Sequence, residues 1–202
     1  MRTKEEKKEL QKFEKAEKLF FFDRFFAATI LKLIPYSVKP NHVTICRFIL
    51  TPIVGILTFY GTYKIALVAF LLTALTDAID GAMARMRDQI TKWGKIYDPI
   101  ADKLLVGMMV FIIVLKYIDF WTAIIIILLE FIIISVAWYR LNKGYKVQAN
   151  VWGKIKMILQ TAGVTILLLS VAFNLADLLP LASTTLYLAI AFAVVSILTY
   201  GI

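Results

Sequence analysis

The sequence has very little of the side-chain chemistry that builds disulfide-bonded and zinc-binding proteins. Among its 202 residues, Cys46 is the only cysteine and His42 is the only histidine. A single cysteine excludes an intramolecular disulfide and a cysteine-based metal cluster, and a single histidine excludes zinc sites that need several imidazoles. A metal site made of several cysteines or several histidines is therefore excluded.

Apolar residues make up most of the chain. Hydrophobic residues make up 60% of the chain and its mean hydropathy is +0.78, whereas a soluble domain is roughly 45–50% apolar. Apolar runs of about twenty residues, the length that crosses a bilayer core as a helix, recur along the chain. They lie at about 42–61, 65–86, 94–117, 120–141, 152–175 and 180–201. The sequence predicts an all-α integral membrane protein whose six transmembrane helices form one domain over residues 37–202.

Residues 1–36 differ from this domain because they mix many charges with a cluster of phenylalanines. Such a composition is typical of an amphipathic helix that lies in the membrane interface, although residues 1–12 also fit a solvated helix. Pro35 and Pro40 then interrupt the helix, and Asn41 can cap the next one. We therefore expect an N-terminal amphipathic interfacial helix before the first span.

The charge distribution predicts an orientation and a class of partner. Lys and Arg gather in the N-terminal segment, in the loop between the second and third spans, and in the loop between the fourth and fifth. The positive-inside rule places these three regions in the cytoplasm. The formal net charge of +9 favours contact with membrane lipids and an anionic substrate over contact with nucleic acid in so apolar a chain. We expect a protein of the cell (inner) membrane whose active site faces the cytoplasm.

Four aspartates stand near the cytoplasmic ends of the second and third spans. Asp77 and Asp80 are three residues apart on one helix, while Asp98 and Asp102 are four residues apart on the next. Each pair shares a helix face, and the short turn between the two helices allows the faces to meet. Four like charges in a low dielectric need neutralisation. Oxygen ligands favour hard divalent cations such as Mg²⁺ or Mn²⁺, and two such ions would form a clamp for a diphosphate.

Other roles are open for intramembrane carboxylates. A single aspartate can anchor an interhelical hydrogen bond or belong to a proton relay. A cation site of four aspartates would also suit an ion-coupled transporter. The absence of an internal repeat and of interrupted helices argues against transport. Gly81 and Gly94, which leave room beside each carboxylate pair for a ligand to approach, favour the metal site.

These residues resemble the signature of the CDP-alcohol phosphotransferase family at every fixed position. The matching string is Asp77-x2-Asp80-Gly81-x2-Ala84-Arg85-x8-Gly94-x3-Asp98-x3-Asp102. The resemblance covers about residues 40–160. It implies a six-helix membrane enzyme, usually a homodimer, that transfers a phosphatidyl-type group from a CDP-linked lipid to an alcohol and releases CMP.

The resemblance also implies roles for individual residues. Asp77, Asp80 and Asp98 would hold two metal ions, with Asp102 contributing and acting as the general base. The residues expected around the nucleotide are Gly81, Ala84, Arg85, Gly94, Asn41 and Thr44.

The strings "PNHVTICRFILTP", "DPIADKLL" and "GKIKMILQ" resemble the phosphatidylglycerophosphate synthase branch, which uses CDP-diacylglycerol and glycerol 3-phosphate. Basic residues that could bind an acceptor phosphate are Arg140, Lys154 and Lys156. The arginines common in that branch's fourth span are missing around Glu130, where the chain reads Leu129-Glu130-Phe131 with Ala137 beyond. A cardiolipin synthase that uses phosphatidylglycerol, or another acceptor, stays an alternative. Glu130 itself could pair with a base or be structural.

Overall fold

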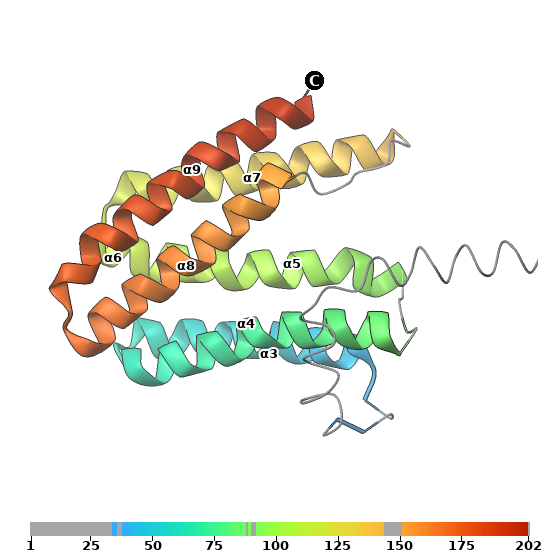
Figure 1. The fold of residues 1–202 in the computed structure, drawn as a ribbon, viewed down its shortest axis with the longest axis horizontal. Coiled ribbons are helices and arrows are strands. Elements are labelled where there is room, and N and C mark those ends of the chain that lie inside the picture. The colour runs from blue at the N-terminus through green and yellow to red at the C-terminus, as the bar shows by residue number, and fades with distance from the viewer. Residues whose placement is uncertain (1–33, 36–37, 88, 90–91, 144–150, 202) are drawn as a thin grey trace, which may run out of the picture. The chain divides into compact units, whose positions relative to one another are not determined.

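A computed structural model describes residues 34–35, 38–87, 89, 92–143 and 151–201. Every regular element in these residues is a helix (Figure 1). The α-helices are α3 (Pro40–Phe59), α4 (Tyr63–Met86), α5 (Lys92–Met109), α6 (Leu115–Tyr117), α7 (Phe120–Asn142), α8 (Val151–Phe173) and α9 (Leu179–Gly201). A π-helical segment, η1 (Val110–Val114), joins α5 to α6, and a 3₁₀ turn, η2 (Ala176–Leu178), precedes α9. The prediction of an all-α protein is confirmed for this part of the chain.

Five of the described helices are long and apolar enough to cross a membrane: α3, α4, α7, α8, and α9 together with η2. Many of their large apolar side chains are exposed, among them Ile49 at 60%, Leu72 at 58% and Ile158 at 68%. A soluble protein rarely leaves so many such side chains in water, whereas lipid accommodates them. The chain is therefore a membrane protein.

The third predicted span, 94–117, falls on the continuous run of α5, η1 and α6. This run is not among the five because its first half is rich in charge. The predicted interfacial helix of residues 1–36 lies outside the described residues, apart from Ile34 and Pro35.

The described helices belong to two compact units. The first unit comprises Met1–Cys46 and Leu75–Asp98, and the second comprises Arg47–Ala74 and Pro99–Ile202. The core of the first unit is small: Ala82 and Met83 are fully buried, and partly buried Val43 and Ile79 pack against them. This packing positions the beginning of α3 beside the end of α4, which is the part of the chain that carries the first two predicted metal ligands.

The second unit holds the larger apolar core. Its buried members include Phe70, Leu105, Met109, Leu167 and Leu186, contributed by α4, α5, α8 and α9. The pair α8 and α9 runs side by side through this unit (Figure 1). A β-carbon at Gly163 of α8 would lie only 2.8 Å from Cγ of Leu186 on α9. The glycine therefore permits the close approach of these two helices.

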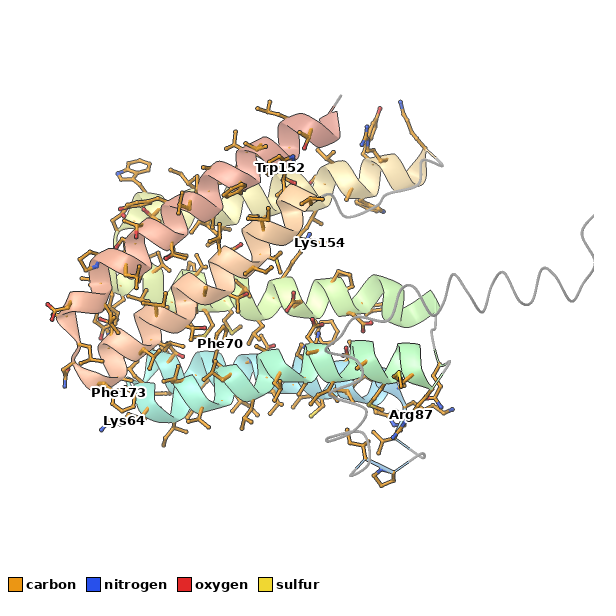
Figure 2. The ribbon with its side chains drawn as sticks, viewed as in Figure 1. Lys64, Phe70, Arg87, Trp152, Lys154 and Phe173 are labelled. Carbon is orange, nitrogen blue, oxygen red and sulfur yellow. The ribbon has the colours of Figure 1, made fainter. Side chains whose placement is uncertain are left out.

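Aromatic and basic side chains gather where helices of the second unit end. Lys64 lies over the ring of Phe173, with its Nζ 5.6 Å from the ring centroid (Figure 2). Lys116 donates a 2.9 Å hydrogen bond to the hydroxyl of Tyr63, which also accepts one of 2.8 Å from Tyr117. Amphipathic rings and lysines of this kind are typical of a membrane–water interface.

Candidate functional site

Thr44, in the second turn of α3, connects two of the predicted metal ligands. Its hydroxyl Oγ1 lies 2.6 Å from Oδ1 of Asp98 on α5 and 3.4 Å from Oδ2 of Asp80 on α4. Thr44 is 1% exposed and Asp80 is 2% exposed, while Asp98 is half-buried. The sequence predicts Thr44 on the nucleotide side, and the structure adds this direct link to the carboxylates.

The distances around Thr44 show which carboxylate accepts the single hydrogen bond that its hydroxyl can donate. A hydroxyl donates one hydrogen bond, and the 2.6 Å contact to Asp98 is the short distance typical of donation to a carboxylate. Because both contacts share one oxygen atom, the carboxylate oxygens of Asp80 and Asp98 lie within about 6 Å of each other, and a divalent metal held by these two residues would supply neutralising positive charge. Thr44 thus donates its hydroxyl proton to Asp98 and lies beside the carboxylate of Asp80.

The remaining signature residues of the first unit lie on the same two helices. Asp77 is half-buried on α4, one turn before Asp80, and it is followed there by half-buried Gly81 and Ala84. Gly94 is buried on α5. The side chain of Arg85 lies outside the described part of the structure. These positions keep Asp77 and Asp80 on one face of α4, as the spacing predicts.

Asp102 belongs to the second unit, four residues after Asp98 along α5, and is half-buried. Within the described residues, no three His, Cys, Asp or Glu side chains are grouped closely enough to form a ready metal site. The donors that are present are carboxylate oxygens, which suit Mg²⁺ or Mn²⁺. The chemistry of the residues therefore fits a divalent metal, and within the first unit the structure brings Asp80 and Asp98 to the same hydroxyl, that of Thr44.

Arg87, just after α4, has a structural role that sequence reasoning missed. Its guanidinium donates hydrogen bonds to the backbone carbonyls of Ile34 at 2.6 Å, Pro35 at 3.2 Å and Val38 at 3.3 Å (Figure 2). Three carbonyl acceptors match the planar fork of donors that arginine provides. The sequence indicates Arg87 only as a cytoplasmic positive charge, since nothing local marks its partners 49 to 53 residues away. The contacts hold the segment before α3 against the end of α4.

The predicted acceptor-phosphate residues differ in their surroundings. Lys154 is exposed near the start of α8, and Arg140 is half-buried in the last turn of α7. Lys156 is 3% exposed and forms a salt bridge with Oε1 of Glu130 on α7. The structure therefore pairs Glu130 with a base, one of the two roles that the sequence left open for it.

A small cavity adjoins this salt bridge. It has a volume of about 10 Å³ and is lined by Glu130, Lys156 and Gln160, together with apolar side chains of α7 and α9, which is room for roughly one water molecule. Oε2 of Glu130 is buried and has no hydrogen-bond partner among the described residues. A polar atom in such a place commonly binds a buried water.

Comparison with known proteins agrees with the motif. The chain matches the family described as CDP-alcohol phosphatidyltransferase over residues 37–195. A CDP-diacylglycerol–glycerol-3-phosphate 3-phosphatidyltransferase of Bacillus subtilis (strain 168) is 33% identical over 174 residues, covering 78% of this chain and 90% of that protein. Proteins of the same name from Rickettsia felis and Mycoplasma genitalium are 33% and 28% identical over 135 and 218 residues. These alignments cover 64% and 93% of this chain, and 74% and 92% of the respective relatives. The match spans the helices that carry the aspartates, and the chain belongs to the CDP-alcohol phosphatidyltransferase family.

Proposed function

We propose that this protein transfers a phosphatidyl group from CDP-diacylglycerol to glycerol 3-phosphate and releases CMP. The observation that carries the proposal is the complete aspartate signature within a family match over residues 37–195. The names of the relatives supply the donor and the acceptor. A CDP-diacylglycerol-dependent cardiolipin synthase, with phosphatidylglycerol as acceptor, is the second candidate because the fourth span has no arginine around Glu130.

In this proposal Asp77, Asp80 and Asp98 hold two divalent ions, Mg²⁺ or Mn²⁺, with Asp102 contributing. The ions would neutralise charge on the donor diphosphate. The hydrogen bond from Thr44 to Asp98 supports this role, since a fixed carboxylate is a better ligand than a mobile one. The residues Gly81, Ala84, Arg85, Gly94 and Asn41 would border the cytidine nucleotide.

Asp102 acts as the general base. Its carboxylate takes the proton of the acceptor hydroxyl as that oxygen bonds to the lipid-linked phosphorus, and the bond from phosphorus to the CMP oxygen breaks. CMP leaves with the electron pair of that bond. The apolar, exposed flanks of the helices leave the acyl chains in lipid while the headgroup reacts.

Arg140 and Lys154 are the acceptor-phosphate candidates whose side chains are not fully buried. Lys156 would bind a phosphate directly only by leaving Glu130. We further propose that α5, η1 and α6 together form a membrane span, the third of six along the chain, that residues 37–202 act as one catalytic domain facing the cytoplasm, and that the enzyme works as a homodimer.

The test is an acceptor screen with purified protein and CDP-diacylglycerol, following CMP release. Glycerol 3-phosphate, phosphatidylglycerol, inositol phosphate and serine are each supplied as the single acceptor, with and without a chelator. Turnover with glycerol 3-phosphate alone, abolished by the chelator, is expected. Turnover with phosphatidylglycerol alone would replace the proposal by the cardiolipin alternative.

A further inference from the structure

Two lysines of the second unit lie outside the three basic regions that the positive-inside rule assigns to the cytoplasm. Lys64 stands in the first turn of α4, Lys116 stands in α6, and both are exposed. Along α5, η1 and α6, Lys116 lies roughly 20 Å from Asp102, at about 1.5 Å per residue. Because we propose that these three elements form one span, Lys116 belongs to the leaflet opposite Asp102. Lys64 belongs to the same leaflet, since its neighbour Tyr63 binds Lys116.

Aromatic side chains hold Lys116 in one place. Its Nζ donates a hydrogen bond of 2.9 Å to the hydroxyl of Tyr63 and lies 5.6 Å and 5.4 Å from the ring centroids of Tyr63 and Tyr117. The two rings pack edge to face, with their centroids 5.7 Å apart. Tyr63 follows a tight turn in which Gly61 has a φ of +81°, a conformation that favours glycine. The ammonium group of Lys116 is therefore preorganised for a ligand, which lowers the entropy cost of binding.

The hydrogen bonds of this group leave several donors available. The hydroxyl of Tyr63 accepts from Lys116 and, at 2.8 Å, from Tyr117, so its own proton remains to be donated. The ammonium group of Lys116 has two further N–H donors. Lys64 lies 5.6 Å from the ring centroid of Phe173 (Figure 2), and in the described part of the chain its ammonium has no hydrogen-bond acceptor. We name Tyr63, Lys64, Lys116 and Tyr117 the donor patch.

The carboxylates of the neighbouring turns do not pair with the donor patch. Asp119 accepts hydrogen bonds from the backbone N–H and the hydroxyl of Thr122, and Asp177 lies in η2. Among the residues that the structure describes, neither forms an ion pair with Lys64 or Lys116. The donor patch therefore presents two positive charges and several hydrogen-bond donors at the surface. A ligand with complementary chemistry is an anion with several acceptor oxygens, such as a phosphate.

An apolar surface continues from the donor patch along α4. Val68, Leu71 and Leu72 are exposed and share a helix face with Lys64. A soluble phosphate would use only the donor patch, whereas a phospholipid would also cover these apolar side chains with its acyl chains. Lysines at a membrane surface attract anionic lipids in particular.

We infer that the donor patch binds the phosphodiester headgroup of an anionic phospholipid in the leaflet opposite the catalytic aspartates. Lys116 and Lys64 neutralise the phosphate, the hydroxyl of Tyr63 donates to one of its oxygens, and the acyl chains lie along the exposed face of α4. The binding is separate from the proposed reaction, because the lipid is held without being converted.

The experiment titrates the full chain, purified in a non-ionic detergent, with dioleoylphosphatidylglycerol and measures the apparent Kd by native mass spectrometry. A chelator is present throughout, so that metal-bound phosphate at the aspartates does not contribute. Dioleoylphosphatidylcholine is the matched lipid, since its choline cancels the charge of the phosphate. Lys116→Met is expected to raise the Kd for phosphatidylglycerol about tenfold or more and to leave that for phosphatidylcholine unchanged. Tyr63→Phe, which removes the hydroxyl that holds Lys116, is expected to raise the former about threefold.

Lys143→Met is the matched control. Lys143 is also an exposed lysine over a tyrosine ring, 4.7 Å from the centroid of Tyr139, but it lies just beyond the C-terminal end of α7. This variant is expected to keep the Kd for phosphatidylglycerol within about twofold of the wild type. Lys116→Arg retains the charge and is expected to recover most of the affinity. Melting temperatures without added lipid, together with CMP release, show whether each variant is folded.

Three results would overturn the inference. Equal Kd values of the wild type for the two lipids would show that the donor patch does not recognise a negative headgroup. Equal weakening by Lys116→Met and Lys143→Met would reduce the attraction to a general effect of surface lysines. Inorganic phosphate that displaces phosphatidylglycerol at equal concentration would make a soluble anion, rather than a lipid, the ligand.

Discussion

Replacing Thr44 with valine tests whether its hydroxyl organises the metal site. Valine keeps the shape of threonine and removes only the donor that lies 2.6 Å from Asp98. The site is 1% exposed at Thr44, so water cannot easily replace the lost bond. A hydrogen bond to a charged group contributes about 1.5–3 kcal/mol, and loss of a group that orients a metal ligand typically lowers metal affinity or activity by about 10- to 100-fold.

The assay is CMP release as a function of Mg²⁺ concentration, with both substrates saturating. Thr44→Val is expected to raise the half-saturating Mg²⁺ concentration by about 10- to 100-fold, and excess metal should restore part of kcat. Thr44→Ser retains the hydroxyl and should shift the curve much less.

Thr58→Val is the matched control for this measurement. Thr58 is an equally buried threonine of α3, and its hydroxyl bonds to the carbonyl of Val54 at 2.8 Å. This control should leave the metal dependence unchanged. A Thr44→Val enzyme with the Mg²⁺ dependence of the wild type would refute the role assigned to the hydroxyl.

Three further predictions concern the base, the helix packing and a helix cap. Asp102→Asn should lower kcat by roughly 10²- to 10⁴-fold without a comparable change in the KM for CDP-diacylglycerol, and near-normal CMP release would remove the assignment of the base. Gly163→Ala should lower the melting temperature because its β-carbon would lie 2.8 Å from a side chain of α9, whereas Gly107→Ala, which meets no atom within 4 Å, should not; equal melting temperatures would contradict the packing argument. The hydroxyl of Thr122, and then its backbone N–H, donate to Asp119 and hold the pKa of that carboxyl below its ordinary value. A lowered pKa means that the stabilisation is present above the ordinary pKa and is lost as the pH falls through the folded-state value. Asp119→Ala should therefore cost about 1 kcal/mol of cap stability at neutral pH and progressively less in acid, and a cost independent of pH would refute the cap.

Long apolar runs allowed most helices to be predicted closely. The fourth predicted span, 120–141, corresponds to α7 at Phe120–Asn142, and the sixth, 180–201, to α9 at Leu179–Gly201. Charged or helix-breaking residues flank these apolar runs on both sides, so the sequence marks where each helix begins and ends. The π-helical segment Val110–Val114 could not be predicted, because its residues are ordinary apolar ones. Its widened backbone depends on packing, since Val110, Ile113 and Val114 are all buried.

Part of the candidate site can likewise be predicted from local sequence, whereas another part depends on tertiary packing. The spacing of Asp77 and Asp80 predicts a shared helix face without any knowledge of the fold. The link from Thr44 to Asp98 joins residues 54 positions apart, and the pair Glu130–Lys156 joins residues 26 positions apart. Such contacts are decided by how helices pack, and a single sequence carries no local signal for them.

The lysines at the start of α8 show why a count of positive charges overestimates the number of cations that can bind an anionic substrate. Lys154 and Lys156 are two residues apart, which is about 200° around a helix. One is consequently exposed and the other is 3% exposed. A buried ammonium in a membrane helix needs a counter-charge, and Glu130, alone in an apolar run of α7, supplies it. The carboxylate and Lys156 cancel each other. The charge left for an anionic acceptor then lies on side chains that Glu130 does not bind directly, and the arginines missing from the fourth span need not be replaced within it.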